Sequence, residues 1–188
     1  MILTTDHLEL REFVKEDWQA VLAYQQKPEY LQFYDWTERS AGEVREFVGM
    51  FLDQQQADPR IKYQLAVTLK TIGQLIGNCG IRLESVEARE ADIGLELDPS
   101  YWSQGYATEA AQAIMRFGFD HLNLHRIWAR SNADNQAAGR VLEKLGMQLE
   151  GRLRENEYFK GRWWDTILYA ILDSEWKAGQ VHDEVNQQ

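Results

Sequence analysis

The region between residues 91 and 122 constrains the fold of this chain more than any other. The apolar stretch IGLEL predicts a strand that stops at Asp98-Pro99, and a loop containing Gly105 then leads into an Ala-rich segment with helical spacing. The first turn of such a helix leaves several backbone N–H groups unpaired and carries the positive end of the helix dipole. Because Gly105 and Ala107 have little or no side chain, a bulky anion can approach this backbone closely. The junction therefore fits a phosphate or pyrophosphate, although a tight turn without a ligand gives the same pattern.

The remaining segments predict a mixed domain around one sheet. Ser40 and Glu43 form a capping-box pair that opens the best-signalled helix. Strands are expected at about 8–13, 63–69, 74–83, 91–97, 126–130, 147–157 and 163–172, and helices at about 17–26, 40–58, 108–122 and 135–145. No linker or repeat interrupts this order. We therefore expect a single α+β domain over residues 1–176 and a polar C-terminal tail over 177–188.

Composition and charge exclude several classes of protein. With 44% hydrophobic residues, the 188-residue chain can bury a sizeable core, unlike a disordered protein. A net charge of -10 repels phosphate backbones, which argues against nucleic-acid binding. It attracts cationic partners such as amines or basic polypeptides, although solubility alone also explains it. No apolar run approaches the roughly 20 residues of a membrane helix, and the N-terminus is unlike a signal peptide, so we expect a cytoplasmic protein without a membrane partner.

The cysteine and histidine residues indicate neither a disulfide nor a metal site. Cys79 is the one cysteine and lies in an apolar, strand-like stretch, which favours a buried structural thiol over a nucleophile. His121 and His125 have the spacing of zinc ligands, but they straddle the end of a helix and have no obvious third ligand. We therefore expect no metal.

The loop after the strand carries a family resemblance. YWSQGYATEA is similar to the pyrophosphate-binding motif of GNAT acetyltransferases, whose common form is [QR]-x-x-G-x-[GA]. Gly105 and Ala107 take the last two places. Trp102 stands where glutamine or arginine is usual, and Gln104 directly precedes the glycine. The Tyr-Trp pair and the following Ala-Thr-Glu-Ala resemble the ribosomal-protein alanine acetyltransferase branch of the superfamily.

Later segments carry the same resemblance. The stretch RIWARSNADNQAAGRVLEKLGMQLEGRLRE is similar to the strand, helix and strand that follow the motif in that branch. Asn135 matches the asparagine that opens the helix, and Lys144-Leu145-Gly146 matches a K-x-G-F signature with Met147 in place of phenylalanine. The segment KGRWWDTILYAILDSEW resembles the closing hairpin. The likeness thus spans nearly the whole chain.

This resemblance implies the GNAT fold and acetyl-CoA as cosubstrate. The implied fold is a central, twisted, mostly antiparallel sheet of about seven strands with splayed middle strands, flanked by about four helices. The pantetheine arm would lie in the gap and the pyrophosphate over residues 104–108. Asn135 would bind near the thioester, although its position also fits a helix N-cap. The cofactor-binding residues expected from the resemblance are Leu95, Leu97, Gln104, Gly105, Tyr106, Ala107, Thr108, Asn135 and Lys144.

The implied reaction is direct attack of a neutral primary amine on the thioester. An α-amine has a pKa of about 7.7–8.0 and needs little help, whereas a lysine amine at about 10.4 needs more. Strand alternation puts Asp92, Gly94 and Glu96 on one face, which makes Glu96 the first choice of base, with a solvent-facing carboxylate as the alternative. The predicted catalytic residues are therefore Glu96 and Asn135, with Asp165 and Glu157 as further carboxylates in reserve.

No general acid is identified from the sequence. Ala138 stands where the ribosomal-protein branch often has a serine, and Leu142 where many GNAT enzymes have a tyrosine. The coenzyme A thiolate then leaves as such or is protonated through water, since thiol pKa values lie near 8.5.

Aromatic and acidic residues are the candidates for acceptor binding. We expect Tyr34, Trp36, Trp164 and Asp165 to line the acceptor groove, although packing in the core or in a dimer also explains the aromatic clusters. The leading hypothesis is acetylation of a protein N-terminal amine, as in ribosomal-protein acetyltransferases, by a monomer or homodimer. The alternatives are an acetyltransferase for a small amine, such as an antibiotic or polyamine, and a non-catalytic acetyl-CoA-binding module.

Overall fold

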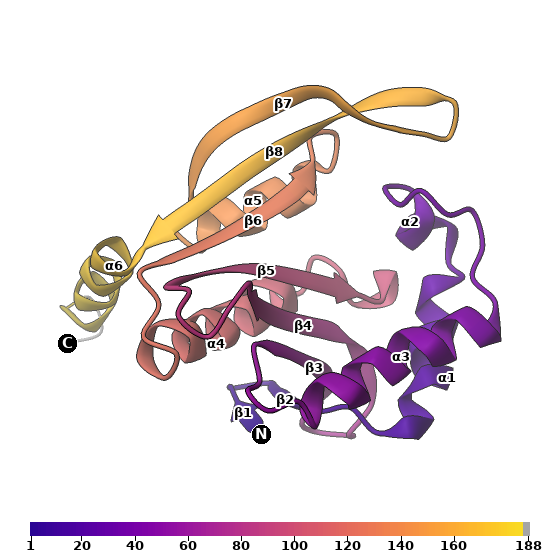
Figure 1. Ribbon diagram of the computed structural model, residues 1–188, viewed down its shortest axis with the longest axis horizontal. Helices are drawn as coiled ribbons and strands as arrows, with labels where there is room; N and C mark the ends of the chain where they lie inside the picture. The colour runs from indigo at the N-terminus through magenta and orange to yellow at the C-terminus, as the bar shows by residue number, and fades with distance from the viewer. Residues whose placement is uncertain (186–188) are drawn as a thin grey trace.

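A single eight-stranded sheet runs through the molecule in the order β1-β2-β3-β4-β5-β6-β8-β7 (Figure 1). The computed structural model describes residues 1–185. The strands are β1 (Ile2–Thr4), β2 (Leu8–Glu12), β3 (Lys62–Leu69), β4 (Leu75–Leu83), β5 (Glu90–Leu97), β6 (Arg126–Asn132), β7 (Gln148–Phe159) and β8 (Arg162–Leu172). Every neighbouring pair is antiparallel except β5 and β6. This architecture confirms the predicted mixed fold and its mostly antiparallel sheet.

Helices cover the two faces of the sheet and bury a hydrophobic cluster on each. They are α1 (Trp18–Gln25), α2 (Pro28–Leu31), α3 (Ala41–Gln55), α4 (Tyr106–Asp120), α5 (Gln136–Lys144) and α6 (Asp173–Val185). The cluster under α4 includes Ile81, Ile114 and Met115, whereas α1 and α3 cover the opposite face around Val21 and Val48. Helices from distant parts of the sequence thus pack on the same strand. Helix α1 contacts β4 on one face of the sheet, and α4 contacts it on the other (Figure 1).

Local signals place most of these elements where the sequence predicts them. The Ser40 hydroxyl accepts from the Glu43 N–H at 3.3 Å, and the Glu43 carboxylate accepts from the Ser40 N–H at 2.7 Å, so the predicted capping box opens α3. No sequence pattern predicts β1, a three-residue edge strand, or the one-turn helix α2. Helix α6 begins at Asp173 and extends through part of the predicted tail, and residues 186–188 lie outside the described part of the chain.

The parallel pair β5 and β6 separates along its length. Register pairs join Glu90–Asp92 to Arg126–Trp128 and then stop, although both strands continue for several residues. The C-terminal halves of the two strands therefore diverge, as the resemblance implied, and expose the edge of β5 on that side. This gap positions the candidate site.

Candidate active site

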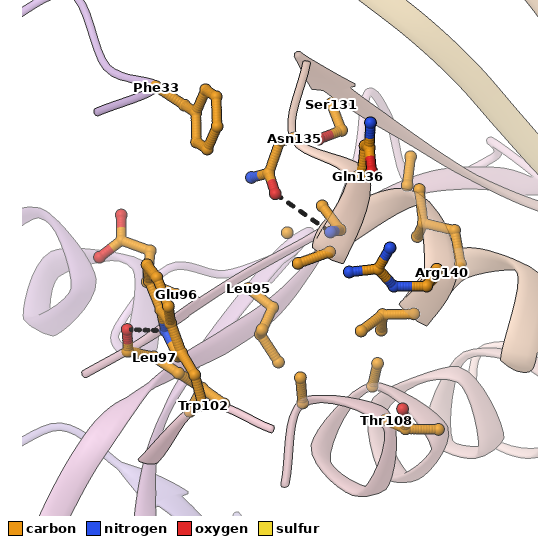
Figure 2. A pocket seen from close by; sticks show the side chains of 18 of the residues that line it. Phe33, Leu95, Glu96, Leu97, Trp102, Thr108, Ser131, Asn135, Gln136 and Arg140 are labelled. Atoms are coloured by element: carbon orange, nitrogen blue, oxygen red, sulfur yellow. Dashed lines mark hydrogen bonds between the residues drawn. The ribbon is translucent and has the colours of Figure 1, made fainter. Parts of the chain in front are cut away.

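A cavity of about 830 Å³ opens where β5 and β6 diverge. Its walls come from β5, β6, the N-terminal end of α4, the length of α5 and the segment around α2. Figure 2 shows Leu95, Glu96 and Trp102 on one side of this space, with Asn135, Gln136 and Arg140 on the other. Of the sequence-predicted cofactor residues, the lining contains Leu95, Leu97, Gly105, Tyr106, Ala107, Thr108, Asn135 and Lys144. Gln104 lies outside it and donates a hydrogen bond to the Ser100 carbonyl at 3.2 Å.

The edge of β5 presents free backbone groups to the gap. Residues of an antiparallel strand point their peptide groups alternately towards and away from a given neighbour. The Asp98 N–H donates to the Ile76 carbonyl of β4 at 2.8 Å, so the peptide groups of Leu95 and Leu97 point away from β4, into the gap. The Leu97 carbonyl already accepts from the Trp102 indole N–H at 2.9 Å (Figure 2). The Leu97 N–H, by the same alternation, faces the gap. The free peptide groups of β5 can therefore form hydrogen bonds with an extended ligand that contains amide groups.

The start of α4 presents unpaired backbone amides at one end of the cavity. Gly105 is the N-cap and has φ +88°, a left-handed conformation that glycine adopts without steric cost. The first helical bond joins the Glu109 N–H to the Gly105 carbonyl at 3.1 Å. Within residues 1–185, the N–H groups of residues 106–108 donate to no backbone carbonyl. These amides therefore suit a phosphate, as the sequence pattern predicts.

Helix α5 brings two cations to the same cavity. Asn135 is its N-cap, and its side-chain oxygen accepts from the Ala138 N–H at 3.1 Å. Arg140 and Lys144, one turn apart, both line the cavity, and neither forms an ion pair with another described residue. Sequence reasoning missed Arg140, although its i, i+4 spacing to Lys144 was a usable signal. The two cations complement the multiple negative charges of a phosphorylated cosubstrate.

Glu96 is held at the opposite wall by three neutral donors. The Tyr24 hydroxyl at 3.1 Å and the side-chain amides of Gln25 and Asn78, each at 3.0 Å, all donate to its Oε2 atom. Burial, and after it the nearby Glu96 charge, raises the pKa of Tyr24 well above its ordinary value, so Tyr24 stays a neutral donor. Glu96 itself is half-buried and lines the cavity, rather than lying free on the surface.

An aromatic wall next to Glu96 surrounds the end of the cavity nearest α2. Tyr30, Phe33 and Tyr34 line it, and the Tyr34 ring stacks between Tyr30 and Trp36, with centroids 4.5 Å apart on each side. Burial, with the Glu96 charge second, raises the pKa of Tyr34.

The other sequence-predicted acceptor residues lie outside the lining. Trp36 touches the aromatic wall only by stacking on Tyr34. The Trp164 ring packs edge-on against the Phe33 ring, with the two centroids 6.4 Å apart. Asp165 accepts from Arg152 at 2.6 Å and from the Glu155 N–H at 2.7 Å. Both bonds lower the pKa of Asp165, so this carboxylate is occupied within the β7–β8 hairpin.

The positions of the two missing acids can now be seen in space. Ala138 and Leu142 both line the cavity, one on the first turn of α5 and one on the next, and neither side chain has an acidic proton to donate. Among the side chains that the structure describes, those of residues 1–179, no group of three from His, Cys, Asp or Glu is arranged to hold a metal ion. The helices within residues 1–185 are too short or too polar to cross a membrane.

Comparisons with known proteins agree with this geometry. Residues 7–148 match the family described as an acetyltransferase (GNAT) domain. The chain is 35% identical over 179 residues to YnaD, an uncharacterized N-acetyltransferase of Bacillus subtilis, covering 94% of this chain and 99% of that protein. Over 90 residues, 48% of each chain, it is 30% identical to spermidine N(1)-acetyltransferase of Escherichia coli.

A solved structure extends the comparison to the whole fold. Ribosomal-protein-S5-alanine acetyltransferase from Vibrio fischeri superimposes with a TM-score of 0.78 at 20% identity, covering 94% of this chain and 98% of that one. The resemblance drawn from the sequence is confirmed by the family match, by the relatives and by the fold. The chain belongs to the GNAT family of acetyltransferases.

Proposed function

We propose that this enzyme transfers the acetyl group of acetyl-CoA to a primary amine, and that the amine is the N-terminal α-amine of a protein. The observation that carries the proposal is one cavity with unpaired helix amides at one end, and with both a free strand edge and a half-buried carboxylate supplied by β5. A structural relative, the S5-alanine acetyltransferase, is named for a protein acceptor, which supports the same class here.

The residues present fit the cosubstrate. The amides of residues 106–108 would hold the pyrophosphate, and Arg140 and Lys144 would neutralise its phosphates. The free peptide groups of Leu95 and Leu97 would pair with the pantetheine amides, and the Leu97 N–H is available to stabilise an oxyanion. Asn135 keeps its side-chain N–H₂ for the same arm, since only its oxygen is used in capping. Bound acetyl-CoA supplies the thioester that the amine attacks, forming a C–N bond as the thiol leaves.

At the other end, Glu96 takes the proton that the amine must lose. Its Oε2 atom is fully occupied by donors, whereas its Oε1 atom accepts no hydrogen bond from the described residues. An α-amine, with a pKa near 7.7–8.0, needs only this modest help, whereas a lysine amine, with a pKa near 10.4, needs more. With no hydroxyl at positions 138 and 142, the coenzyme A thiolate leaves as such or is protonated through water.

A polyamine acceptor is the second candidate. Glu29, exposed at the mouth of the cavity, and Glu96 supply two carboxylates to the same end, which suits a dication. The similarity to a spermidine acetyltransferase, which covers 48% of this chain, supports this alternative.

An acceptor panel with acetyl-CoA, read as thiol release, distinguishes these readings. We expect release with peptides that have a free Ala or Ser N-terminus and none with the same peptides blocked at the N-terminus. Release with spermidine alone would shift the assignment to the polyamine. Tight acetyl-CoA binding without release on any acceptor would replace the enzyme by a binding module.

Substituting Gly105 with tryptophan tests the anion site. The indole would cover the amides of residues 106–108, so we expect the Kd for acetyl-CoA to rise at least about 100-fold, the loss of two hydrogen bonds to a charged group. Gly105→Ala is the matched control, because it imposes the same strained positive φ with no bulk, and no atom lies within 4 Å of its added Cβ. Calorimetry that gives both variants the same affinity would place the phosphates elsewhere.

A further inference from the structure

A row of polar side chains crosses the face of β4 and β5 that α1 covers. Asn78 pairs with Glu96 across the two strands, and Arg82 pairs with Asp92. Between these polar pairs lies the pair of Gly80 with Gly94. Gln64 of β3 lies beside them, and both Gln64 and Asn78 are at least nine-tenths buried. Buried amides must be fully hydrogen-bonded, so their orientations are determined by their partners.

Arg82 determines the orientation of one chain of amides. A guanidinium only donates, and Arg82 Nη1 lies 3.3 Å from Gln64 Oε1, which turns the Gln64 N–H₂ towards Asn78 Oδ1 at 2.6 Å. The Asn78 N–H₂ is then left to donate to Glu96 Oε2 and to the Tyr24 hydroxyl, each at 3.0 Å. Arg82 is itself held in place by an ion pair with Asp92.

Arg39 determines the second chain in the same way. Its Nε–H donates to Gln25 Oε1 at 3.1 Å, so the Gln25 N–H₂ must point to Glu96 Oε2 at 3.0 Å. The guanidinium is fixed over the Trp36 ring, 4.7 Å from its centroid. The two chains of amides, each beginning at a donor-only arginine, therefore end in two N–H₂ groups on the same carboxylate oxygen.

Two glycines make room for the first chain. A Cβ on Gly80 would lie 2.1 Å from Gln64 Oε1, and one on Gly94 would lie 2.8 Å from an Arg82 guanidinium nitrogen. Since these residues pair with each other across β4 and β5, a hollow runs over the sheet at the level where Gln64 and Arg82 meet. The chain of amides is thus built into the strands and is not a chance surface contact.

We propose that Arg82 and Arg39 are positioning residues that act on Glu96 through these amides, a role that rests on Glu96 being the base of the proposed function. With both arginines present, every neighbour of Oε2 is a donor, and Oε1 remains the oxygen that receives the proton. Without them, Gln64, Asn78 and Gln25 can turn over and present an oxygen to the carboxylate. The carboxylate is then repelled from its position, so catalysis slows while the cosubstrate end of the cavity is untouched.

The experiment measures kcat, and acetyl-CoA Kd by calorimetry, in Arg82→Met and Arg39→Met. We expect kcat to fall roughly tenfold in each, the loss of one correctly oriented hydrogen bond to a charge, with an unchanged Kd. Arg82→Lys keeps a donor and should recover most of the rate. Arg45→Met is the matched control, because Arg45 also stacks on an aromatic ring, Trp18, but contacts no part of either chain. It should leave kcat unchanged.

Double variants test the path itself. Arg82→Met and Gln64→Leu interrupt the same chain, so the double variant should be no slower than the slower single one, whereas Arg82→Met with Arg39→Met should lose about 100-fold. If Arg82→Met unfolds, Gly94→Ala displaces the same guanidinium without removing a polar group and should lower kcat likewise.

The outcomes separate this inference from the proposed function. Full activity in Glu96→Gln would remove the base on which the inference rests. A slow Glu96→Gln together with normal kcat in Arg82→Met and Arg39→Met would overturn the inference and leave the proposed function intact. If the losses of kcat in Arg82→Met and Gln64→Leu add in full in the double variant, the two residues do not act through one chain of amides, and the inference is overturned as well.

Discussion

Replacing Glu96 with glutamine is expected to lower kcat by a factor of about 10²–10⁴, the usual contribution of a positioned general base. Glutamine has nearly the same shape, and its carbonyl can still accept the bonds from Tyr24, Gln25 and Asn78, so the wall of the cavity should stay in place. The other group of the glutamine side chain is an N–H₂, which cannot take a proton as the carboxylate oxygen Oε1 can. The loss should therefore fall on the rate and not on acetyl-CoA affinity.

The measurement is steady-state thiol release with a free N-terminal peptide, alongside calorimetry with acetyl-CoA. Glu90→Gln is the control, since Glu90 lies on the same strand but pairs with Arg126 at the closed end of β5 and β6. It should leave kcat within about twofold of the parent value, as expected for an exposed ion pair. A Glu96→Gln enzyme with the parental kcat would mean that water or another group accepts the proton.

Replacing Gly77 with alanine is expected to destabilise the protein by about 3 kcal/mol, at the upper end of ordinary overpacking. The added Cβ would lie 2.1 Å from the Glu96 backbone oxygen and 2.9 Å from the Leu97 Cα. Both are backbone atoms of the paired strand β5, and they cannot rotate away as a side chain does. The strands must separate at the edge of the cavity, so the same variant should also weaken acetyl-CoA binding.

Urea unfolding with a fixed m-value tests this expectation. Gly49→Ala is the matched control, because its added Cβ meets nothing within 4 Å and alanine favours a helix over glycine by roughly 0.8–1 kcal/mol. The two Gly→Ala changes should therefore move the unfolding midpoint in opposite directions. A Gly77→Ala protein as stable as the parent would show that β4 and β5 tolerate a wider spacing than the structure has.

The sequence alone predicted those features that depend on residues near one another in the chain. The capping box of α3, the strand that stops at Asp98 and the glycine that opens α4 all arise from contacts over a few residues. The family resemblance added the splayed pair β5 and β6 and the family itself. Most of the element order and the class of enzyme were therefore accessible without coordinates.

What only the tertiary structure decided is which side chains converge. The donors to Glu96 come from Tyr24, Gln25 and Asn78, which are 72, 71 and 18 residues away in the sequence, and no local pattern predicts that they meet. The same holds for Trp164 and Asp165, which lie outside the cavity lining because the β7–β8 hairpin uses them for its own contacts. Backbone preference acts over a few residues, whereas the surroundings of a carboxylate depend on strand register and helix packing, which exist only after the chain has folded.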